Sequence, residues 1–223
     1  MLPRLAIVDP ELTYGLPPEI TASTGLDALT QVLEPFVSNR SNPITDVLCR
    51  EGMRRAARSL RRVYAGACAH LDDQAAREDM ALTSLFGGLA LANARLGAVH
   101  GFAAPIGGLF PAPHGAVCAR LLPHIMMVNV RALEARQPQS DVLLRYNEVA
   151  QILTDNPAAT ASDGVTWLHD TCATLHIKPL SAYGLSPADF PKLIAKAAAA
   201  NSMQGNPIKL TAEEMEEILE RAV

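Results

Sequence analysis

Aromatic residues are scarce in this chain of 223 residues, of which they make up only 4%. Runs of β-branched residues are rare as well, whereas Ala, Leu, Arg and Glu, which favour helices, dominate. A sequence so poor in strand-forming residues does not supply the many short strands of a β-sandwich or a barrel. The composition therefore predicts an all-α protein.

Cysteine is also sparse, and no two cysteines stand in a CxxC pair: the four are Cys49, Cys68, Cys118 and Cys172. No unbroken apolar run approaches the roughly 18 residues that a membrane-spanning helix needs. The apolar run near the start, Leu5–Val8, is too short for a secretory signal. We therefore expect a soluble, cytoplasmic protein with no disulfides and no membrane contact.

The chain has no excess of positive charge, since its formal net charge is −4. Nucleic-acid binders normally present a basic face, so we expect no nucleic-acid partner. Apolar residues make up 49% of the chain and charged residues 19%, which is typical of a folded globular protein. A local run of arginines is interpreted as the solvated face of one helix: Arg50, Arg54, Arg55, Arg58, Arg61 and Arg62.

Apolar periodicity and capping residues predict about eight helices. The expected starts include Ser23 or Thr24, Asn42-Pro43, Asp72 or Asp73, and a capping box that begins at Thr211. The expected ranges are about 24–37, 42–65, 72–95, 115–131, 140–153, 160–175, 187–201 and 211 onward. Leu5–Val8 is predicted as a lone strand. A lone strand cannot satisfy its own backbone groups, so it needs a partner outside the helical part.

We therefore divide the chain into an N-terminal strand and arm, residues 1–20, and a helical domain of metal-binding type, residues 21–223. Asp27 and Gln31 lie four residues apart on the first long helix, so their side chains share one face. His100 and His114 stand at the two ends of "HGFAAPIGGLFPAPHG", which is rich in glycine and proline. Two imidazoles and a carboxylate form a ligand set that suits Fe(II) or Zn(II).

Four stretches carry a resemblance to a known family: "VDPELTYGLPPEITASTGLDALTQVLEPFVS", "NPITD", "REDMALTSLFGGLALANARLGAVHGFAAPIGGLFPAPHG" and "NSMQGNPIKLTAEEMEEIL". They closely resemble the iron-containing (group III) alcohol dehydrogenases, from about Leu5 to the C-terminus. The resemblance implies the helical metal-binding domain of that family, of dehydroquinate synthase-like fold. It also implies metal ligands at the positions of Asp27, Gln31, His100 and His114, held together by a rigid loop between two helices.

The sequence departs from the family pattern in three ways. Gln31 stands where the family usually has a histidine ligand, and a neutral amide oxygen is a poorer ligand for iron or zinc. Ala104 in "HGFAAP" replaces a further histidine, and alanine cannot relay a proton. No GxGxxG or "GGGS"-like phosphate loop is present, so we expect the N-terminal nucleotide-binding domain of the family to be absent.

The sequence leaves three hypotheses for the function of the chain. In the first, the chain is the metal-binding domain of an NAD(P)-linked alcohol or aldehyde oxidoreductase, with a degraded metal site, and is inactive alone. NAD(P) would bind only with a separate nucleotide-binding domain as partner. In the second, it is a metal-free scaffold or binding protein. In the third, the two histidines and one carboxylate serve oxygen or hydrolytic chemistry.

The family's missing domain also predicts an exposed apolar surface. The strand "LAIV" and the segment "GLFPAP" are its expected parts. Exposed apolar patches favour self-association. We therefore expect a homo-oligomer, either a dimer or a larger assembly. Cys118, four residues after His114, is interpreted as a buried structural thiol.

Overall fold

The computed structural model describes residues 5–223, and this part of the chain forms nine α-helices and no strand. The all-α prediction is confirmed. The helices are α1 (Pro18–Val37), α2 (Pro43–Cys68), α3 (Gln74–Ala94), α4 (Ala98–Leu109), α5 (His114–Arg136), α6 (Asp141–Thr154), α7 (Ala161–Thr174), α8 (Phe190–Ala198) and α9 (Ala212–Ala222). Four short 3₁₀ turns connect them: Pro10–Thr13, Leu180–Tyr183, Pro187–Asp189 and Ser202–Gly205.

Several helices begin where their capping residues predict. The Asn42 side chain accepts hydrogen bonds from the first backbone N–H groups of α2 and forms a capping box there. Asp73 caps α3, and Thr211 forms the predicted capping box at the start of α9. These caps satisfy N–H groups that the first helical turn leaves without partners. The local sequence thus determines where these three helices begin.

The predicted start of the first long helix is wrong. α1 begins at Pro18, whose fixed φ suits the first turn of a helix, and not at Ser23 or Thr24. The hydroxyls of Ser23 and Thr24 instead donate to the carbonyl of Ile20, at 3.2 and 2.7 Å. They act as helix-interior residues that bond back to the preceding turn.

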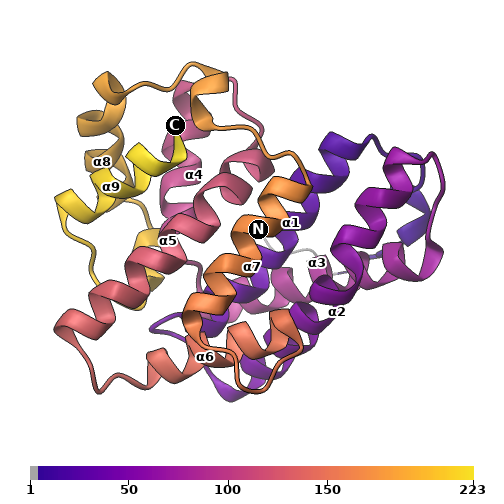
Figure 1. Ribbon diagram of the computed structural model, residues 1–223, viewed down its shortest axis with the longest axis horizontal. Coiled ribbons are helices and arrows are strands. Elements are labelled where there is room, and N and C mark those ends of the chain that lie inside the picture. Colours follow the sequence, from indigo (N-terminus) through magenta and orange to yellow (C-terminus); the bar gives the residue numbers. More distant parts are fainter. Residues whose placement is uncertain (1–4) are drawn as a thin grey trace.

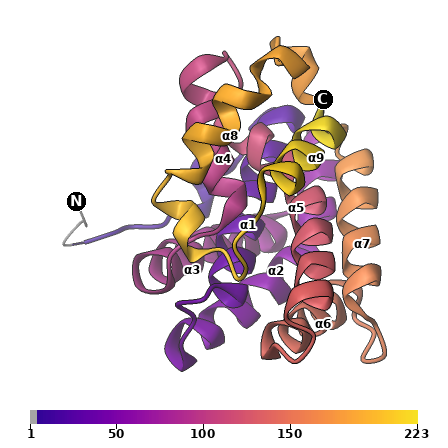
Figure 2. The ribbon, with the colours of Figure 1, turned by 90° about the vertical axis from the view of Figure 1, so that its left-hand side faces the viewer.

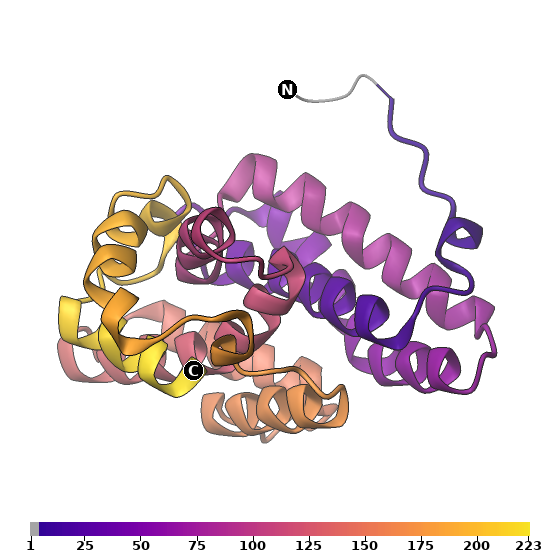
Figure 3. The same cartoon turned by 90° about the horizontal axis from the view of Figure 1, so that it is seen from above.

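The N-terminal strand is also not formed. Leu5–Val8 is extended but pairs with nothing, and it reaches away from the helices (Figures 2 and 3). Leu5 is 76% exposed and Ile7 is 84% exposed. Because residues 5–223 contain no strand, the backbone of this segment has no ladder partner there. Residues 1–4 of the predicted arm lie outside the described part of the chain.

Most of the glycine- and proline-rich stretch, through Leu109, is helical, and only residues 110–113 form a connection in place of the expected longer loop. α4 carries His100 near its start and contains Pro105. It follows α3 after a bend of 101°. At the bend Arg95 has φ 63°, and the Ser38 hydroxyl donates to the Ala94 carbonyl at 2.7 Å. The bend turns α4 back onto α5.

Two helices form the centre of the molecule. α1 packs against α2, α3 and α5, while α5 also contacts α4, α7 and α9. Figure 1 shows α2 and α3 on one side of the molecule and α8 and α9 on the other. Among the described residues, α5 alone has the length and hydropathy of a membrane-spanning helix, but 78% of its apolar window is buried inside the protein. It is therefore a core helix.

The arginine-rich face of α2 is largely neutralised. Arg55 and Arg58 both bind Asp79 on α3, with closest contacts of 2.8 and 2.6 Å. Arg50 pairs with Glu148 on α6. Each of these arginines contacts a carboxylate of a neighbouring helix, so the run joins α2 to the helices beside it.

Candidate metal site

Asp27 lies in the middle of α1 and is held by the residue one turn later. The Gln31 side-chain N–H donates to Asp27 Oδ2 at 3.0 Å. The other carboxylate oxygen, Oδ1, is buried and has no hydrogen-bond partner. A buried carboxylate oxygen without a donor is costly, so this atom points to a ligand that the protein residues do not supply.

His100, on α4, faces Asp27 and is 7% exposed. Its Nδ1 lies 2.7 Å from Glu34 Oε2, and its Nε2 lies 3.4 Å from Asp27 Oδ1. Burial alone would lower the pKa of His100. Its close contacts with Asp27, Cys118 and Glu34 outweigh burial and raise that pKa to about 12. Without a metal the imidazole is therefore protonated on both nitrogens: Nδ1 donates to Glu34, and Nε2 faces Asp27 in the interior of the site.

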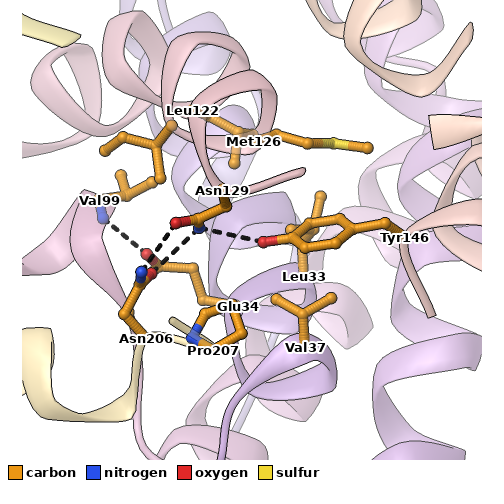
Figure 4. A pocket seen from close by; sticks show the side chains of 12 residues that line it. Leu33, Glu34, Val37, Val99, Leu122, Met126, Asn129, Tyr146, Asn206 and Pro207 are labelled. Carbon is orange, nitrogen blue, oxygen red and sulfur yellow. Dashed lines mark hydrogen bonds between the residues drawn. The ribbon is translucent and has the colours of Figure 1, made fainter. Parts of the chain in front are cut away.

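Glu34 is itself fixed by a buried network that Figure 4 shows. Its Oε1 accepts the Val99 backbone N–H at 2.7 Å. Asn206 accepts the neighbouring Ala98 N–H at 3.1 Å and exchanges hydrogen bonds with Asn129. The cavity among these side chains measures about 10 Å³, which is space for one water at most. Glu34 and Asn206 together cap the start of α4 and so place His100.

His114 is the first residue of α5, and its side chain is 52% exposed. Its Nε2 lies 3.7 Å from Asp27 Oδ1, and its ring centre lies 5.4 Å from that of His100. The approach of α5 to α1 depends on Gly115, because a Cβ there would lie 2.6 Å from the Ser23 carbonyl oxygen. Glycine at this position therefore lets His114 reach Asp27.

Cys118 follows one turn after His114 and is fully buried. Its Sγ lies 3.5 Å from His114 Nε2 and 3.8 Å from His100 Nε2. Burial raises the pKa of this thiol to about 12. One donor atom each from Asp27, His100, His114 and Cys118 lies within 4.8 Å of all the others.

The charges of the site also affect Asp27. Burial by itself would raise the pKa of this carboxyl. The close approach of His100 Nε2 and the electrostatic attraction of the His100 and His114 imidazoles outweigh burial, so the pKa lies below its usual value. Asp27 is therefore held as a carboxylate, the form that binds cations.

The structure brings together three of the predicted site residues, Asp27, His100 and His114, and it places the fourth, Gln31, beside Asp27. Sequence reasoning missed Glu34. Its signal was a carboxylate seven residues after Asp27, on the same face of an otherwise apolar helix. Ala104 lies one turn after His100 and is exposed, so with His114 it stands on the open side of the site.

The chain resembles known proteins along nearly all of its length. Residues 21–223 match the family described as "Fe-containing alcohol dehydrogenase family, C-terminal". Alcohol dehydrogenase 4 of Saccharomyces cerevisiae is 34% identical over 221 residues. The 1,3-propanediol dehydrogenase of Klebsiella pneumoniae is 36% identical over 222 residues. Each alignment covers 99% of this chain and 55% of the relative.

The fold is similar to that of solved structures as well. An alcohol dehydrogenase from Oenococcus oeni superimposes with a TM-score of 0.84 and 32% sequence identity. The match covers 96% of this chain and 54% of that protein. The chain thus spans about half the length of the curated relatives it matches.

Proposed function

Because the chain belongs to the Fe-containing alcohol dehydrogenase family and matches its C-terminal part, we propose that it supplies the helical, metal-binding part of an NAD(P)-linked alcohol or aldehyde oxidoreductase. One observation carries the proposal. The buried Asp27 Oδ1 has no hydrogen-bond partner, and two imidazole nitrogens face it at 3.4 and 3.7 Å. A divalent cation among these atoms would satisfy all three.

The residues present fit such a cation. Asp27, His100 and His114 would hold Fe(II) or Zn(II), whose preferred ligands include carboxylate and imidazole. When bound, the metal supplies a Lewis acid that polarises an alcohol or carbonyl oxygen. Glu34 keeps the Nδ1 proton of His100 in place, and Gln31 holds Asp27 Oδ2, so both orient a ligand.

We propose that the site is degraded for the reaction of the family, because the residues present do not supply two features that the resemblance implies for it. Ala104, on the open side of the site, has no group that can donate or relay a proton. Residues 5–223 form no strand, so they offer no strand-to-helix phosphate loop for a dinucleotide. We therefore expect NAD(P) to bind only when a nucleotide-binding domain is supplied, and the 223-residue chain alone to be inactive.

Two measurements test this function. In an anaerobic titration of metal-stripped protein with Fe(II) and Zn(II), we expect one equivalent to bind, and His100→Ala and His114→Ala each to lose that binding. In an NAD(P)-linked alcohol oxidation assay, we expect no turnover by the chain alone. Turnover that survives repurification and disappears in His114→Ala would contradict the predicted inactivity.

A metal-free scaffold is the second candidate, and one set of contacts favours it. Gln31 bonds to Asp27 and Glu34 bonds to His100 without any ion. Under this alternative the titration shows no binding at micromolar metal, and both histidine variants match the wild type.

We also propose that the chain self-associates. Leu5, Ile7 and Leu12 are 76%, 84% and 81% exposed, and Leu109 is 38% exposed. Covering such side chains is favourable by about 25 cal/mol per Å² of apolar surface. We expect light scattering to show a dimer or a larger assembly, and a monomer at high concentration would contradict this. All four cysteines are free thiols, which fits the cytoplasmic location that we propose.

A further inference from the structure

The geometry points to Cys118 as a fourth metal ligand, in place of Gln31. The site would then bind its cation through one carboxylate, two imidazoles and one thiolate, and it would prefer Zn(II) to Fe(II). This inference rests on the proposed function, since it names the ligands and the metal of the same site.

Four of the six distances between the donor atoms are close to those of tetrahedral coordination, and all six are within 4.8 Å. Zinc binds nitrogen and oxygen at about 2.0–2.1 Å and sulfur at about 2.3 Å. In a tetrahedral site, two nitrogen or oxygen ligand atoms therefore lie about 3.3 Å apart, and a nitrogen and a sulfur ligand atom lie about 3.6 Å apart. Asp27 Oδ1 lies 3.4 and 3.7 Å from the two imidazole Nε2 atoms. Cys118 Sγ lies 3.8 and 3.5 Å from the same two atoms.

Gln31 has another role in the structure. A carboxylate only accepts hydrogen bonds, so the atom that Gln31 presents to Asp27 Oδ2 at 3.0 Å is its amide nitrogen, which has no lone pair for a metal. Its Oε1 lies beside α3, where a Cβ on Gly87 would be 3.3 Å from it. Gln31 therefore positions Asp27 through Oδ2 and leaves Oδ1 for the ion.

The helix geometry brings Cys118 to the site. His114 and Cys118 are separated by four residues on α5, so their side chains lie on one face, one turn apart. Cys118 is buried at the inner end of the site, whereas His114 is half exposed at its opening. The thiol thus closes the side of the site that solvent does not reach.

Ligation through Cys118 needs a thiolate, which a bound divalent cation can produce. Binding of a divalent cation would release the Cys118 thiol proton and the His100 Nε2 proton to solvent as the metal–sulfur and metal–nitrogen bonds form. His100 keeps its Nδ1 proton on Glu34 and offers the lone pair of Nε2. Soft thiolate ligands favour zinc over the harder Fe(II).

Substitution with Co(II) tests the assignment, because a cobalt–thiolate bond gives a near-ultraviolet charge-transfer band. We would load metal-stripped wild type, Cys118→Ser, Cys118→Ala and Cys172→Ser with one equivalent of Co(II). Cys172 is the matched control, since it is a buried thiol whose Sγ donates to the Ala119 carbonyl at 3.3 Å on the other side of α5. Circular dichroism would establish that each variant is folded.

We expect the band in wild type and Cys172→Ser, and its loss in both Cys118 variants. Zn(II) affinity should fall in Cys118→Ser by more than the roughly 10–100-fold typical of losing a residue that only supports a ligand, and the ratio of Zn(II) to Fe(II) affinity should fall with it. Cobalt bound with full affinity but without the band in the wild type would overturn the role of Cys118 and leave the proposed function intact. No Co(II), Zn(II) or Fe(II) binding by wild type would overturn both.

Discussion

Replacing Glu34 by Gln should both destabilise the protein and weaken its metal site. Glu34 is 4% exposed, and its two oxygens accept from two different donors, the Val99 N–H and His100 Nδ1, each at 2.7 Å. A carboxamide of the same shape has only one acceptor oxygen. If the Gln amide nitrogen faces Val99, two N–H groups oppose each other. If it faces His100, two N–H groups again oppose each other unless the imidazole carries its proton on Nε2 instead of Nδ1.

The cost can be worked out from these contacts. Losing one buried hydrogen bond to a charged group costs about 1.5–3 kcal/mol, so Glu34→Gln should lower the free energy of unfolding of the metal-free protein by about 2 kcal/mol. The glutamine side chain would no longer favour the His100 tautomer that keeps its proton on Nδ1 and leaves the Nε2 lone pair for a metal, so metal affinity should fall about 10–100-fold. Urea denaturation at pH 7 measures the first effect, and a competition titration with a chromophoric chelator measures the second.

Glu220→Gln is the matched control, because Glu220 is an exposed residue of α9. A surface change of this kind should stay within about 0.5 kcal/mol of wild type. If Glu34→Gln behaved like Glu220→Gln in both assays, the role assigned to Glu34 would be wrong.

Two further predictions concern a second buried histidine and a glycine. Burial, together with the positive charges of Arg120 and His169, lowers the pKa of His124 to about 3. In the unfolded chain the pKa of this histidine is near 6.5, so the unfolded chain binds a proton there first as the pH falls. The free energy of unfolding should therefore drop by about 2 kcal/mol between pH 7 and pH 5. His124→Gln should remove that part of the slope in urea titrations, and an unchanged slope would refute the assignment. Gly115→Ala should cost about 1–3 kcal/mol, because its Cβ would meet the Ser23 carbonyl oxygen at 2.6 Å, and should weaken metal binding by moving His114. Wild-type stability and affinity in that variant would show that α1 and α5 can separate without harm.

The helices that the sequence predicts correctly are those whose ends carry their own signals. Asn42, Asp73 and Thr211 bond to N–H groups within three residues of themselves, so a short stretch of sequence contains both partners. α4 has no such signal. Its first N–H groups bond to Glu34, 65 residues before Val99, and to Asn206, 108 residues after Ala98. Its glycines and Pro105 favour a loop, and tertiary contacts override that preference.

In the candidate site, too, only the contacts between residues close in sequence could be predicted. Asp27 and Gln31 pair across one turn of a single helix, so their spacing alone shows that they can meet. The proximity of His100 and His114 to Asp27 came only from the family resemblance, because they lie on α4 and α5. Glu34 has no partner near it in sequence, since it contacts Val99 and His100 on α4, 65 and 66 residues later. Long-range packing of this kind leaves no local pattern.

Anomalous diffraction at the zinc absorption edge, on crystals of the zinc-loaded protein, tests most directly the claim that this chain holds a metal. The account predicts one strong peak bonded to Asp27 Oδ1, His100 Nε2 and His114 Nε2 at about 2.0–2.1 Å, with Cys118 Sγ at about 2.3 Å. A fully loaded crystal with no peak among these atoms, or with zinc bound only at other residues, would contradict it.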